Sequence, residues 1–354
     1  MSKKNKVMHL SSNSGLYPNK FVPDYSEFVM NNIKGSVHHF YYVGDGIGIE
    51  KHQKWRVYNN SFMSGIKLLI CMCFYDLIVF HSIPSAKVTL ILAFFIKYFK
   101  KCDLVVWGGE IHHQAVRKAG IRECLLPYFN KQFIKGCKGY ITYIKEDFDY
   151  IKNNINPKAK WLDLGGFYPS NILKSSISNS YAEKVTDEAI NILVGVSALK
   201  RNNHFEIIDT LGKSFSHECK IHIPLSYGDK EYAYQVEKYA KEILGEKNVY
   251  AIYEHVDYAT YLDFLKTIDI AVFSHEGQQG MGNIRNLIGM GKTVYLNPKS
   301  VTWSYLYNLG FEIYDYKTMK DFDFYISEKN IEIARKEFSF ESTLTTQIKY
   351  YTFN

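Results

Sequence analysis

The sequence lacks the short motifs that mark many hydrolases, P-loop proteins and zinc enzymes. It contains no G-x-S-x-G, no G-x-x-x-x-G-K-[ST] and no H-E-x-x-H, so we expect none of these chemistries. Its six cysteines include no pair at zinc-site spacing. We also expect no export signal, and together these absences favour reduced thiols in a cytoplasmic protein.

Long hydrophobic runs are missing as well. The most apolar stretch, VTLILAFFI at residues 88–96, has nine residues and is followed by Lys97, Lys100 and Lys101. Nine residues are too few to span a bilayer as a helix. A buried helix is the first interpretation. The alternative is a surface helix whose apolar end enters the membrane interface while the lysines meet anionic headgroups.

Charge is unevenly distributed along the chain. Residues 1–180 carry 24 Lys and Arg against 12 Asp and Glu, whereas residues 181–354 carry 19 against 24. The basic half suggests an anionic partner such as a nucleic acid, a phosphorylated ligand or an anionic membrane surface. The alternative is a merely solvated surface.

Strand-like and helix-like patterns alternate along the chain, which predicts right-handed βαβ crossovers and parallel sheets covered on both faces. In the first half, strand patterns occur at 6–10, 38–43, 77–80, 104–107, 139–143 and 161–164, and helix patterns at 23–31, 61–73, 85–99, 123–135 and 145–153. In the second half, strand patterns occur at 191–196, 220–225, 249–253, 268–274 and 293–296, and helix patterns at 204–211, 231–244, 258–266 and 283–290. Ser85 is a candidate helix cap.

The alternation predicts an α/β protein with two Rossmann-like domains facing a central cleft. Residues 1–175 form the first domain, 188–320 the second, and 321–354 a C-terminal helix and tail. Residues 169–185 are polar and rich in Ser and Asn, as expected of a linker. The last residues, 338–354, look irregular, and the sequence leaves open whether they pack back on the first domain. Ligands of open parallel sheets bind beyond the C-terminal ends of strands.

One stretch organises the search for a site. Residues 268–296, IDIAVFSHEGQQGMGNIRNLIGMGKTVYL, read as a strand, a glycine-rich loop, a helix and a strand. Free N–H groups at such a helix N-terminus bind anions, most often phosphate. Gly280 and Gly282 would let the backbone approach that ligand. The alternative is only a tight connection.

Polar residues follow the neighbouring strands of the second domain. Ser197, Arg201, Asn203 and His204 precede one helix and are suited to a phosphate or sugar. Further loops before helices hold Tyr227 and Gly228, and Glu254 and His255. Four polar loops on one sheet edge predict a binding site better than any single loop does.

The first domain offers a candidate general base. In the element Trp107-Gly108-Gly109-Glu110, partial burial would raise the pKa of Glu110 and suit it to proton transfer. His112 and His113 are rivals, and His81 ends a neighbouring strand. Each of these residues is also consistent with a solvated loop position.

Two Asp-x-Asp pairs have the form that metal-dependent sugar-nucleotide enzymes use. They are Asp147 with Asp149 and Asp321 with Asp323. Both pairs lie in helix-like, Lys-flanked segments rather than at a strand end, so we expect no metal site.

The strand-end loops also resemble a known family. ILVGVSALKRNNH (192–204), IPLSYGDKEYA (223–233), HVDYATYLDFLKTIDIAVF (255–273) and QQGMGNI (278–284) resemble the TDP-Fuc4NAc transferases of glycosyltransferase family 56. Those enzymes add 4-acetamido-4,6-dideoxy-D-galactose to lipid II of enterobacterial common antigen. VWGGEI (106–111) is similar to the family's Trp-Gly-x-Asp element. Glu110 stands where Asp is expected, Val196 where Asn is usual, and the first eighty residues match poorly.

The resemblance implies a GT-B fold in which the second domain holds the donor nucleotide and the first holds the acceptor, with no metal and no cofactor. It implies that Gln278, Gln279, Gly280, Gly282 and Asn283 line the donor site. It places Gly195, Ser197, Asn203, His204, Tyr227 and Gly228 near the donor phosphates, where Arg201 would add charge.

We therefore expect a metal-independent glycosyltransferase, cytoplasmic and peripheral on the inner face of the cell membrane. Its donor would be a nucleotide diphosphate, with a TDP-sugar favoured, carrying an acylamino-deoxy sugar. Its acceptor would be a polyprenyl-diphosphate-linked oligosaccharide of enterobacterial common antigen or O-antigen synthesis. Glu110 or His112 would be the catalytic base. The alternatives are another nucleotide sugar with a different acceptor, or a non-catalytic protein that binds anions or nucleic acid. No recognised nucleic-acid motif supports the last of these.

Overall fold

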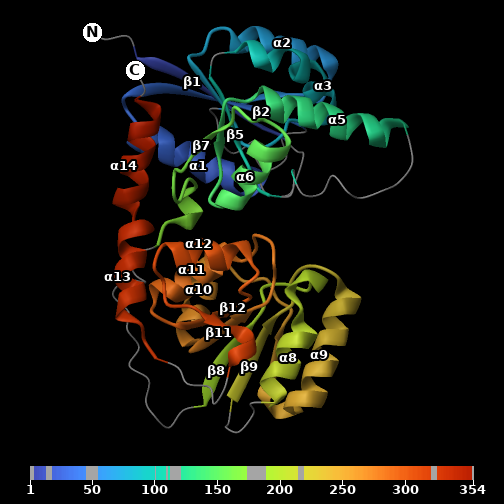
Figure 1. The fold of residues 1–354 in the computed structure, drawn as a ribbon, viewed down its shortest axis with the longest axis vertical. Helices are drawn as coiled ribbons and strands as arrows, with labels where there is room; N and C mark the ends of the chain where they lie inside the picture. The colour runs from blue at the N-terminus through green and yellow to red at the C-terminus, as the bar shows by residue number, and fades with distance from the viewer. Residues whose placement is uncertain are drawn as a thin grey trace. The chain divides into compact units, whose positions relative to one another are not determined.

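The computed structural model describes residues 4–12, 18–44, 55–99, 101–108, 111, 121–173, 189–213, 219–319 and 325–352, with the backbone alone for 18–20 and 121–124. The chain forms two compact units (Figure 1). Unit 1 comprises Met1–Ile172 and Phe340–Asn354, and unit 2 comprises Leu173–Ser339. Each unit is an α/β domain with a parallel sheet, so the predicted fold class is confirmed.

Unit 1 is built on a seven-stranded sheet in the order β3-β2-β1-β4-β5-β6-β7. Every pairing in it is parallel. The strands are β1 (Asn5–Ser12), β2 (Ser36–Val43), β3 (Trp55–Tyr58), β4 (Leu77–Phe80), β5 (Cys102–Val105), β6 (Gly139–Ile141) and β7 (Lys160–Leu162). The strand order reverses beside β1, so the helices divide between the two faces of the sheet.

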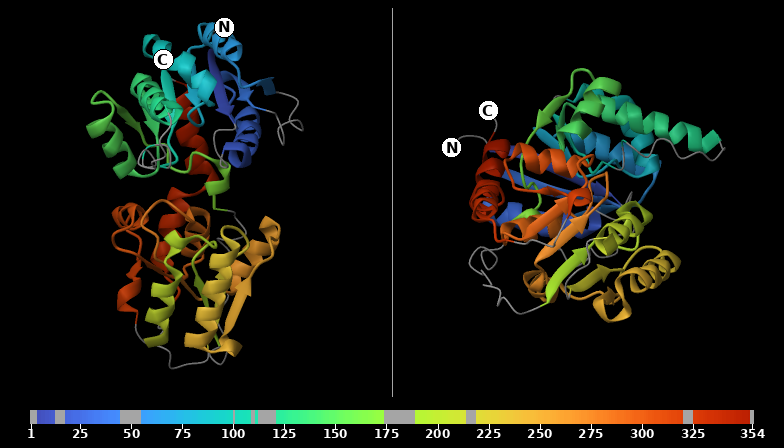
Figure 2. Two further views of the ribbon diagram at one scale, coloured as in Figure 1. Left: turned by 90° about the vertical axis from the view of Figure 1, so that its right-hand side faces the viewer. Right: turned by 60° about the horizontal axis from the view of Figure 1, so that its bottom comes forward.

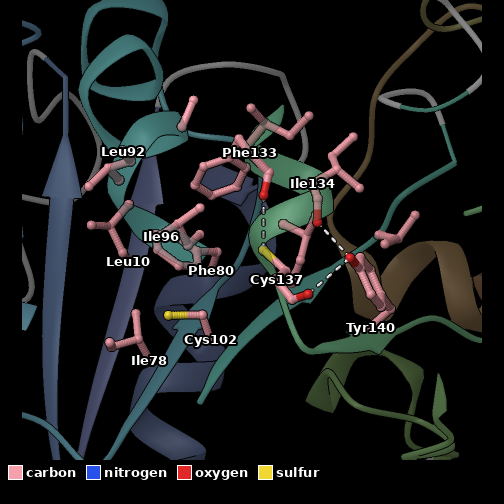
Figure 3. Packing of buried hydrophobic residues seen from close by; sticks show 14 of the residues in the cluster. Leu10, Ile78, Phe80, Leu92, Ile96, Cys102, Phe133, Ile134, Cys137 and Tyr140 are labelled. Atoms are coloured by element: carbon pink, nitrogen blue, oxygen red, sulfur yellow. Dashed lines mark hydrogen bonds between the residues drawn. The ribbon is translucent and has the colours of Figure 1, made fainter. Parts of the chain in front are cut away.

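The helices of unit 1 are α1 (Pro18–Asn32), α2 (Phe62–Met72), α3 (Ala86–Phe95), α5 (Ile121–Gly136), α6 (Lys145–Asn154) and α14 (Phe340–Tyr351), with short 3-10 turns η1 (Ile96–Tyr98) and η3 (Pro169–Asn171). Helices α2, α3, α5 and α6 pack on one face. Figure 3 shows part of their core, where Phe80 and Cys102 meet Leu92, Ile96 and Phe133. Helices α1 and α14 pack on the other face.

Helix α3 is the apolar stretch of the sequence, and the buried-helix interpretation holds for its middle. Val88 and Leu92 are fully buried, as is Ile96 at the start of η1, whereas the C-terminal end of α3 is exposed at Phe94 and Phe95. Ser85 occupies the N-cap position of α3, as predicted, but it does not cap the helix through its side chain. Its side chain makes no bond to the helix because its hydroxyl donates to Asn60 Oδ1, 2.9 Å away.

The last residues of the chain are helical, contrary to their irregular appearance in the sequence. Helix α14 returns to unit 1, where Tyr351 is fully buried and its hydroxyl bonds to that of Tyr25 on α1. Gln347 Nε2 donates to the carbonyl of Phe167 at 2.9 Å, and Tyr350 OH donates to Asp103 Oδ2 at 2.7 Å. Thr and aromatic residues have weak helix preference, so this packing stabilises a helix that propensity alone does not predict.

Unit 2 has a six-stranded parallel sheet in the order β10-β9-β8-β11-β12-β13 (Figures 1 and 2). Its strands are β8 (Ile190–Val194), β9 (Cys219–Pro224), β10 (Val249–Ile252), β11 (Ile270–Phe273), β12 (Thr293–Leu296) and β13 (Tyr314–Asp315). Helices α8 (His204–Lys213) and α9 (Lys230–Leu244) cover one face. Helices α10 (Tyr258–Thr267), α11 (Met281–Gly289), α12 (Val301–Asn308) and α13 (Glu328–Glu337) cover the other. The remaining 3-10 turns are η4 (Lys200–Asn202), η5 (Glu246–Asn248) and η6 (Tyr316–Thr318).

A row of histidines crosses the α1–α14 face of the unit 1 sheet. His38 on β2, His9 on β1 and His81 after β4 are joined through their ring nitrogens, at 2.9 Å for His38–His9 and 3.1 Å for His9–His81. The row ends at Ser36 Oγ, 2.7 Å from His38, and at Tyr168 OH, 2.7 Å from His81. A hydrogen bond between two imidazoles needs one donor and one acceptor nitrogen, which neutral rings supply.

Burial keeps these histidines neutral. Desolvation, reinforced by the neighbouring histidines, lowers the pKa of His9 well below its usual value. Burial also lowers the pKa of His38 to about 4 and that of His81 to about 3. In the unfolded chain each ring takes up a proton near pH 6.5. The stabilisation is therefore fully present above pH 6.5 and declines as the pH falls towards the folded-state values.

We predict that unit 1 becomes less stable between pH 6.5 and pH 5, by up to about 1.4 kcal/mol per pH unit for each fully buried histidine. His38→Gln, which keeps hydrogen-bonding capacity but cannot titrate, should make this dependence shallower. Urea unfolding of a Trp303→Phe background, in which the remaining tryptophans Trp55, Trp107 and Trp161 all lie in unit 1, measures the effect by fluorescence. The matched control is His255→Gln at an exposed position of unit 2. An equal slope in the wild type and in His38→Gln would contradict the prediction.

Candidate functional site

The ends of β8 and β11 form the centre of the candidate site in unit 2. These strands are neighbours, with Ile192 paired to Ile270. The chain leaves β8 for α8 on one face of the sheet and leaves β11 for α11 on the other. Strand order reverses between them, and ligands of open parallel sheets bind at such a reversal.

Hydrogen bonds join the loops after β8 and β11. Gln279 Nε2 donates to Ser197 Oγ at 3.1 Å, and Asn203 Nδ2 donates to the carbonyl of Ser274 at 3.3 Å. Gly280 adopts a left-handed conformation with φ of +65°, and a Cβ there would lie 2.7 Å from Val196 Cγ1. The close approach of the two loops therefore requires glycine at position 280.

The loop after β9 joins the same edge. The N–H of Ala198 donates to the carbonyl of Tyr227, and the N–H of Asp229 donates to the carbonyl of Ala198, each at 2.9 Å. Gly228 has φ of +119° and lies against the Ala198 carbonyl, which leaves no room for a side chain. Tyr227 itself is exposed.

The loop after β10 differs from the other three. Strand β10 is the outermost strand, two positions from β8, and within the described part of unit 2 residues 253–257 make no hydrogen bond to the other loops. Its helix α10 reaches the site instead, through Tyr261 OH, which accepts from Asn283 Nδ2 at 2.9 Å. Of the four predicted loops, the structure thus joins three.

Helix α11 begins without a side-chain cap. The side chains of Asp229, Asp257 and Ser300 accept backbone N–H bonds at the starts of α9, α10 and α12. Helix α11 has Gly280 at this position and no side-chain bond. Gly282 in its first turn is exposed, and a Cβ there would have nothing within 4 Å. The start of α11 thus combines open space with the positive end of a helix dipole.

Buried polar atoms without a partner gather at this edge. Among the described residues they include His204 Nε2, Asn202 Oδ1, Gln278 Oε1 and Gln279 Oε1. His204 is fully buried, and Gly195, with φ of +68°, packs against its ring; a Cβ there would lie 2.6 Å from Nε2. Buried polar atoms normally find partners, so a cluster lacking them marks a place where a polar ligand would supply the missing bonds.

The two histidines at the site are neutral. Burial lowers the pKa of His204 to about 4. Burial also lowers the pKa of His275 to about 4; the nearby main chain of Gln279 partly opposes this shift, and the charge of Arg201 adds to it. Arg201 is exposed. The edge therefore offers neutral donors and acceptors, with the exposed guanidinium group of Arg201 beside them.

Sequence reasoning missed three residues of this edge, namely Asn202, Tyr261 and His275. Asn202 Nδ2 donates to Ser197 O at 3.0 Å and to Ser197 Oγ at 3.2 Å, which shapes the loop after β8. His275 directly follows β11 and is 2% exposed. Asn202 and His275 lie in loops that the sequence analysis had already named, so their positions in the sequence could have identified them. Tyr261 lies inside a helix, where no pattern marked it.

In unit 1, Glu110, His112 and His113 lie outside the described residues. The element before them is placed: Trp107 Nε1 donates to the carbonyl of His81 at 2.7 Å. Gly108 has φ of +83°, and a Cβ there would lie 3.2 Å from Asp147 Oδ2. Asp147 is in the first turn of α6 and is buried. Asp147, which the sequence analysis placed on a helix flanked by lysines, therefore lies next to the Trp107-Gly108 element.

Within the described ranges, no group of three or more His, Cys, Asp or Glu side chains is arranged to hold a metal ion. The Asp147 and Asp149 pair lies on α6, and Asp321 and Asp323 fall outside those ranges. None of the described helices combines the length and apolar character needed to cross a bilayer.

The fold is that of GT-B glycosyltransferases. The structure is similar to a glycosyltransferase from Rickettsia africae, with TM-score 0.62, 13% identity and coverage of 99% of this chain and 98% of that one. It is similar to the lipopolysaccharide outer core galactosyltransferase WaaB, with TM-score 0.65, 10% identity and coverage of 97% and 98%. It is also similar to HepE from Anabaena in complex with UDP, with TM-score 0.65, 11% identity and coverage of 98% and 99%.

The sequence identifies the family within this class. Residues 77–340 match the 4-alpha-L-fucosyltransferase family, glycosyl transferase group 56. The chain belongs to this family, as the strand-end loops predicted, and it is a glycosyltransferase.

The two glycines at the start of α11 should respond differently to alanine. Gly280→Ala forces a left-handed conformation and a clash with Val196, so we predict a loss of about 1–2 kcal/mol in the free energy of unfolding. Gly282→Ala meets no neighbour and should change stability by less than about 1 kcal/mol, in the stabilising direction. Hydrogen exchange of the β11 and α11 peptides measures both effects. Equal losses in the two variants would show that the conformation of Gly280 is not required.

Proposed function

We propose that this protein transfers an acylamino-deoxy sugar of the Fuc4NAc kind from a TDP-sugar to a polyprenyl-diphosphate-linked oligosaccharide. The proposed pathway is the synthesis of a surface polysaccharide, enterobacterial common antigen or O-antigen. The membership of family 56 and the resemblance of residues 192–284 to the TDP-Fuc4NAc transferases support the donor and the acceptor. We further propose that unit 2 holds the donor and unit 1 the acceptor.

One observation supports the donor site most strongly. The uncapped start of α11 adjoins buried, partnerless polar atoms at the point where strand order reverses. We propose that the donor diphosphate lies at the N–H groups of residues 281–283. Ser197, Gln279 and His204 would then bond to the diphosphate or the sugar. The complex of HepE with UDP supports a nucleotide diphosphate as ligand.

The same groups would stabilise the leaving group. As the bond between the anomeric carbon and the diphosphate oxygen breaks, negative charge grows on that oxygen. The N–H groups at the start of α11 and the helix dipole favour this charge, and their fixed orientation avoids reorganisation during the reaction. We propose that the exposed Arg201 supplies the positive charge for which other transferases use a metal ion.

The acceptor hydroxyl must lose its proton as its oxygen attacks the anomeric carbon. We propose Glu110 as the base, with His112 as the alternative. Asp147 is buried beside Gly108, which stands two positions before Glu110 in the sequence, and we propose that its carboxylate acts on Glu110. A neighbouring negative charge raises the pKa of a carboxyl group, which would improve Glu110 as a base near neutral pH.

A lipid-linked acceptor would bring the enzyme to a membrane. We propose a peripheral position on the inner face of the cell membrane, where the basic first half of the chain meets anionic lipid. The alternative is a transferase of the same fold with another nucleotide sugar and another acceptor.

A thermal-shift screen of TDP-, UDP- and GDP-sugars, with and without EDTA, tests the donor. We predict the largest shift for TDP-sugars and no effect of EDTA. Gly282→Val should remove most of the shift, with affinity lowered at least about tenfold, because the side chain fills the space at the start of α11. Ala259→Val, at the equivalent exposed position of the capped helix α10, is the matched control. A normal shift in Gly282→Val would exclude this position for the diphosphate.

Turnover tests the base. Glu110→Gln should lower kcat by about 100-fold or more, since general-base catalysis contributes on that scale, while donor affinity stays within about twofold of the wild type. A parallel His112→Gln variant separates the two candidates. Wild-type turnover in Glu110→Gln would transfer the role to His112 or Asp147.

A further inference from the structure

Three helices on one face of unit 1 expose an unusual amount of apolar side chain. Helix α2 turns Leu68 and Met72 into the core, yet its outer side is also apolar: Phe62, Ile66 and Ile70 follow one another at four-residue spacing. A helix at an aqueous surface normally presents polar residues on its outer side. Phe74, directly after α2, continues the stripe and is 70% exposed.

The neighbouring helices extend this stripe. The end of α3 and η1 exposes Phe94, Phe95 and Tyr98, the last of them 73% exposed. Helix α5 exposes Leu125, Leu126 and Tyr128. We define the α2–α3–α5 surface as the eleven exposed residues Phe62, Met63, Ile66, Ile70, Phe74, Phe94, Phe95, Tyr98, Leu125, Leu126 and Tyr128.

These helices pack side by side in one layer on one face of the sheet (Figure 1). Gly65 of α2 lies against α3, where a Cβ would be 3.0 Å from Ile91 Cγ1. The rings of Phe94 on α3 and Phe129 on α5 are 5.6 Å apart. The exposed residues therefore belong to one continuous helical layer, and a patch of this kind marks an interaction site.

Among the described side chains of this layer, the charges have a single sign. The described side chains of α2, α3, η1 and α5 include Lys67, Lys87, Lys97, Lys131 and Lys135, all exposed. No Asp or Glu occurs in residues 62–72, 86–98 or 125–136. A second protein or a second copy of this chain would place these lysines against a mixed surface, whereas an anionic lipid surface meets both the apolar side chains and the ammonium groups.

We propose that the α2–α3–α5 surface docks unit 1 on an anionic phospholipid bilayer. The phenylalanine, leucine and isoleucine side chains enter the interface, and the five lysines lie at the level of the phosphate groups. The tyrosines at positions 98 and 128 suit the boundary between water and lipid. The apolar stretch of the sequence supplies only the end of α3 to this surface, and most of the contact comes from α2 and α5.

This inference rests on the proposed function, because a lipid-linked acceptor is the reason for unit 1 to bind a bilayer. It names the surface of unit 1 that makes this contact. The test is co-sedimentation of the full chain with vesicles of phosphatidylcholine, with or without phosphatidylglycerol. We expect binding only to vesicles that contain phosphatidylglycerol, weakened by added salt because the exposed charges are screened.

Two surface variants and two matched controls give the decisive comparison. Lys97→Glu, Lys131→Glu and Lys135→Glu together should weaken binding on the order of 100-fold, since each lysine near an anionic surface contributes roughly fivefold. Ile66→Ser, Ile70→Ser and Phe74→Ser together should abolish sedimentation. The controls are Lys213→Glu, Lys238→Glu and Lys247→Glu, and Tyr234→Ser, Ile243→Ser and Tyr307→Ser, all at exposed positions of unit 2. The controls should bind vesicles like the wild type.

Binding of TDP without vesicles, measured in the same variants, should stay unchanged and shows that they are folded. Gly282→Val should lose TDP binding but keep normal vesicle binding. This variant therefore distinguishes a failure of the proposed donor site from a failure of the α2–α3–α5 surface. Three results would overturn the proposal: unchanged vesicle binding in both surface variants, equal wild-type binding to vesicles without phosphatidylglycerol, or a dimer that these variants dissociate in the absence of any vesicle binding.

Discussion

Parallel pairing of β8 and β11 is the constraint on which the candidate site depends. Because the two strands run in the same direction, both end at one edge of the sheet, and because their helices cover opposite faces, no helix closes the gap between them. The loops can approach only where side chains are small. Gly195, Gly228 and Gly280, all with positive φ, occupy these places. A site for a ligand is thus a consequence of topology, and glycine keeps the loops close enough to use it.

The candidate site lowers the stability of unit 2, and apolar burial elsewhere in the unit offsets this loss. Each buried polar atom without a partner costs about 1–3 kcal/mol, and several gather around Ser197 and Gln279. Two apolar cores on either side of the sheet supply the compensating burial, with Ile192, Ile221 and Val272 on one side and Leu193, Ala271 and Leu287 on the other. The polar atoms cannot relax, because the strands that carry their loops are held in these cores. Groups that are fixed in this way need no reorientation when a ligand binds to them.

The sequence allowed prediction of what depends on local pattern. Strand β12 was predicted with its observed bounds, and the loops of the candidate site were found because polar residues follow apolar strands at regular intervals. The features that depend on contacts between distant residues were not predicted. Helix α14 forms because Tyr351 and Gln347 meet residues more than a hundred positions away. The row of His38, His9 and His81 exists only through the register of three strands. Ser85 had the right residue type for a cap, but Asn60 offered its hydroxyl another partner.

Helix α14 has a consequence for the order in which the protein is made. Unit 1 contains the first residues of the chain, yet the core on the α1 side of its sheet, which includes Tyr25 and Phe167, is completed only by Gln347 and Tyr351. On the ribosome, unit 2 will therefore have all of its residues before unit 1 does. Through most of translation one face of the N-terminal sheet therefore stays partly exposed. A chaperone would bind the exposed face during this interval.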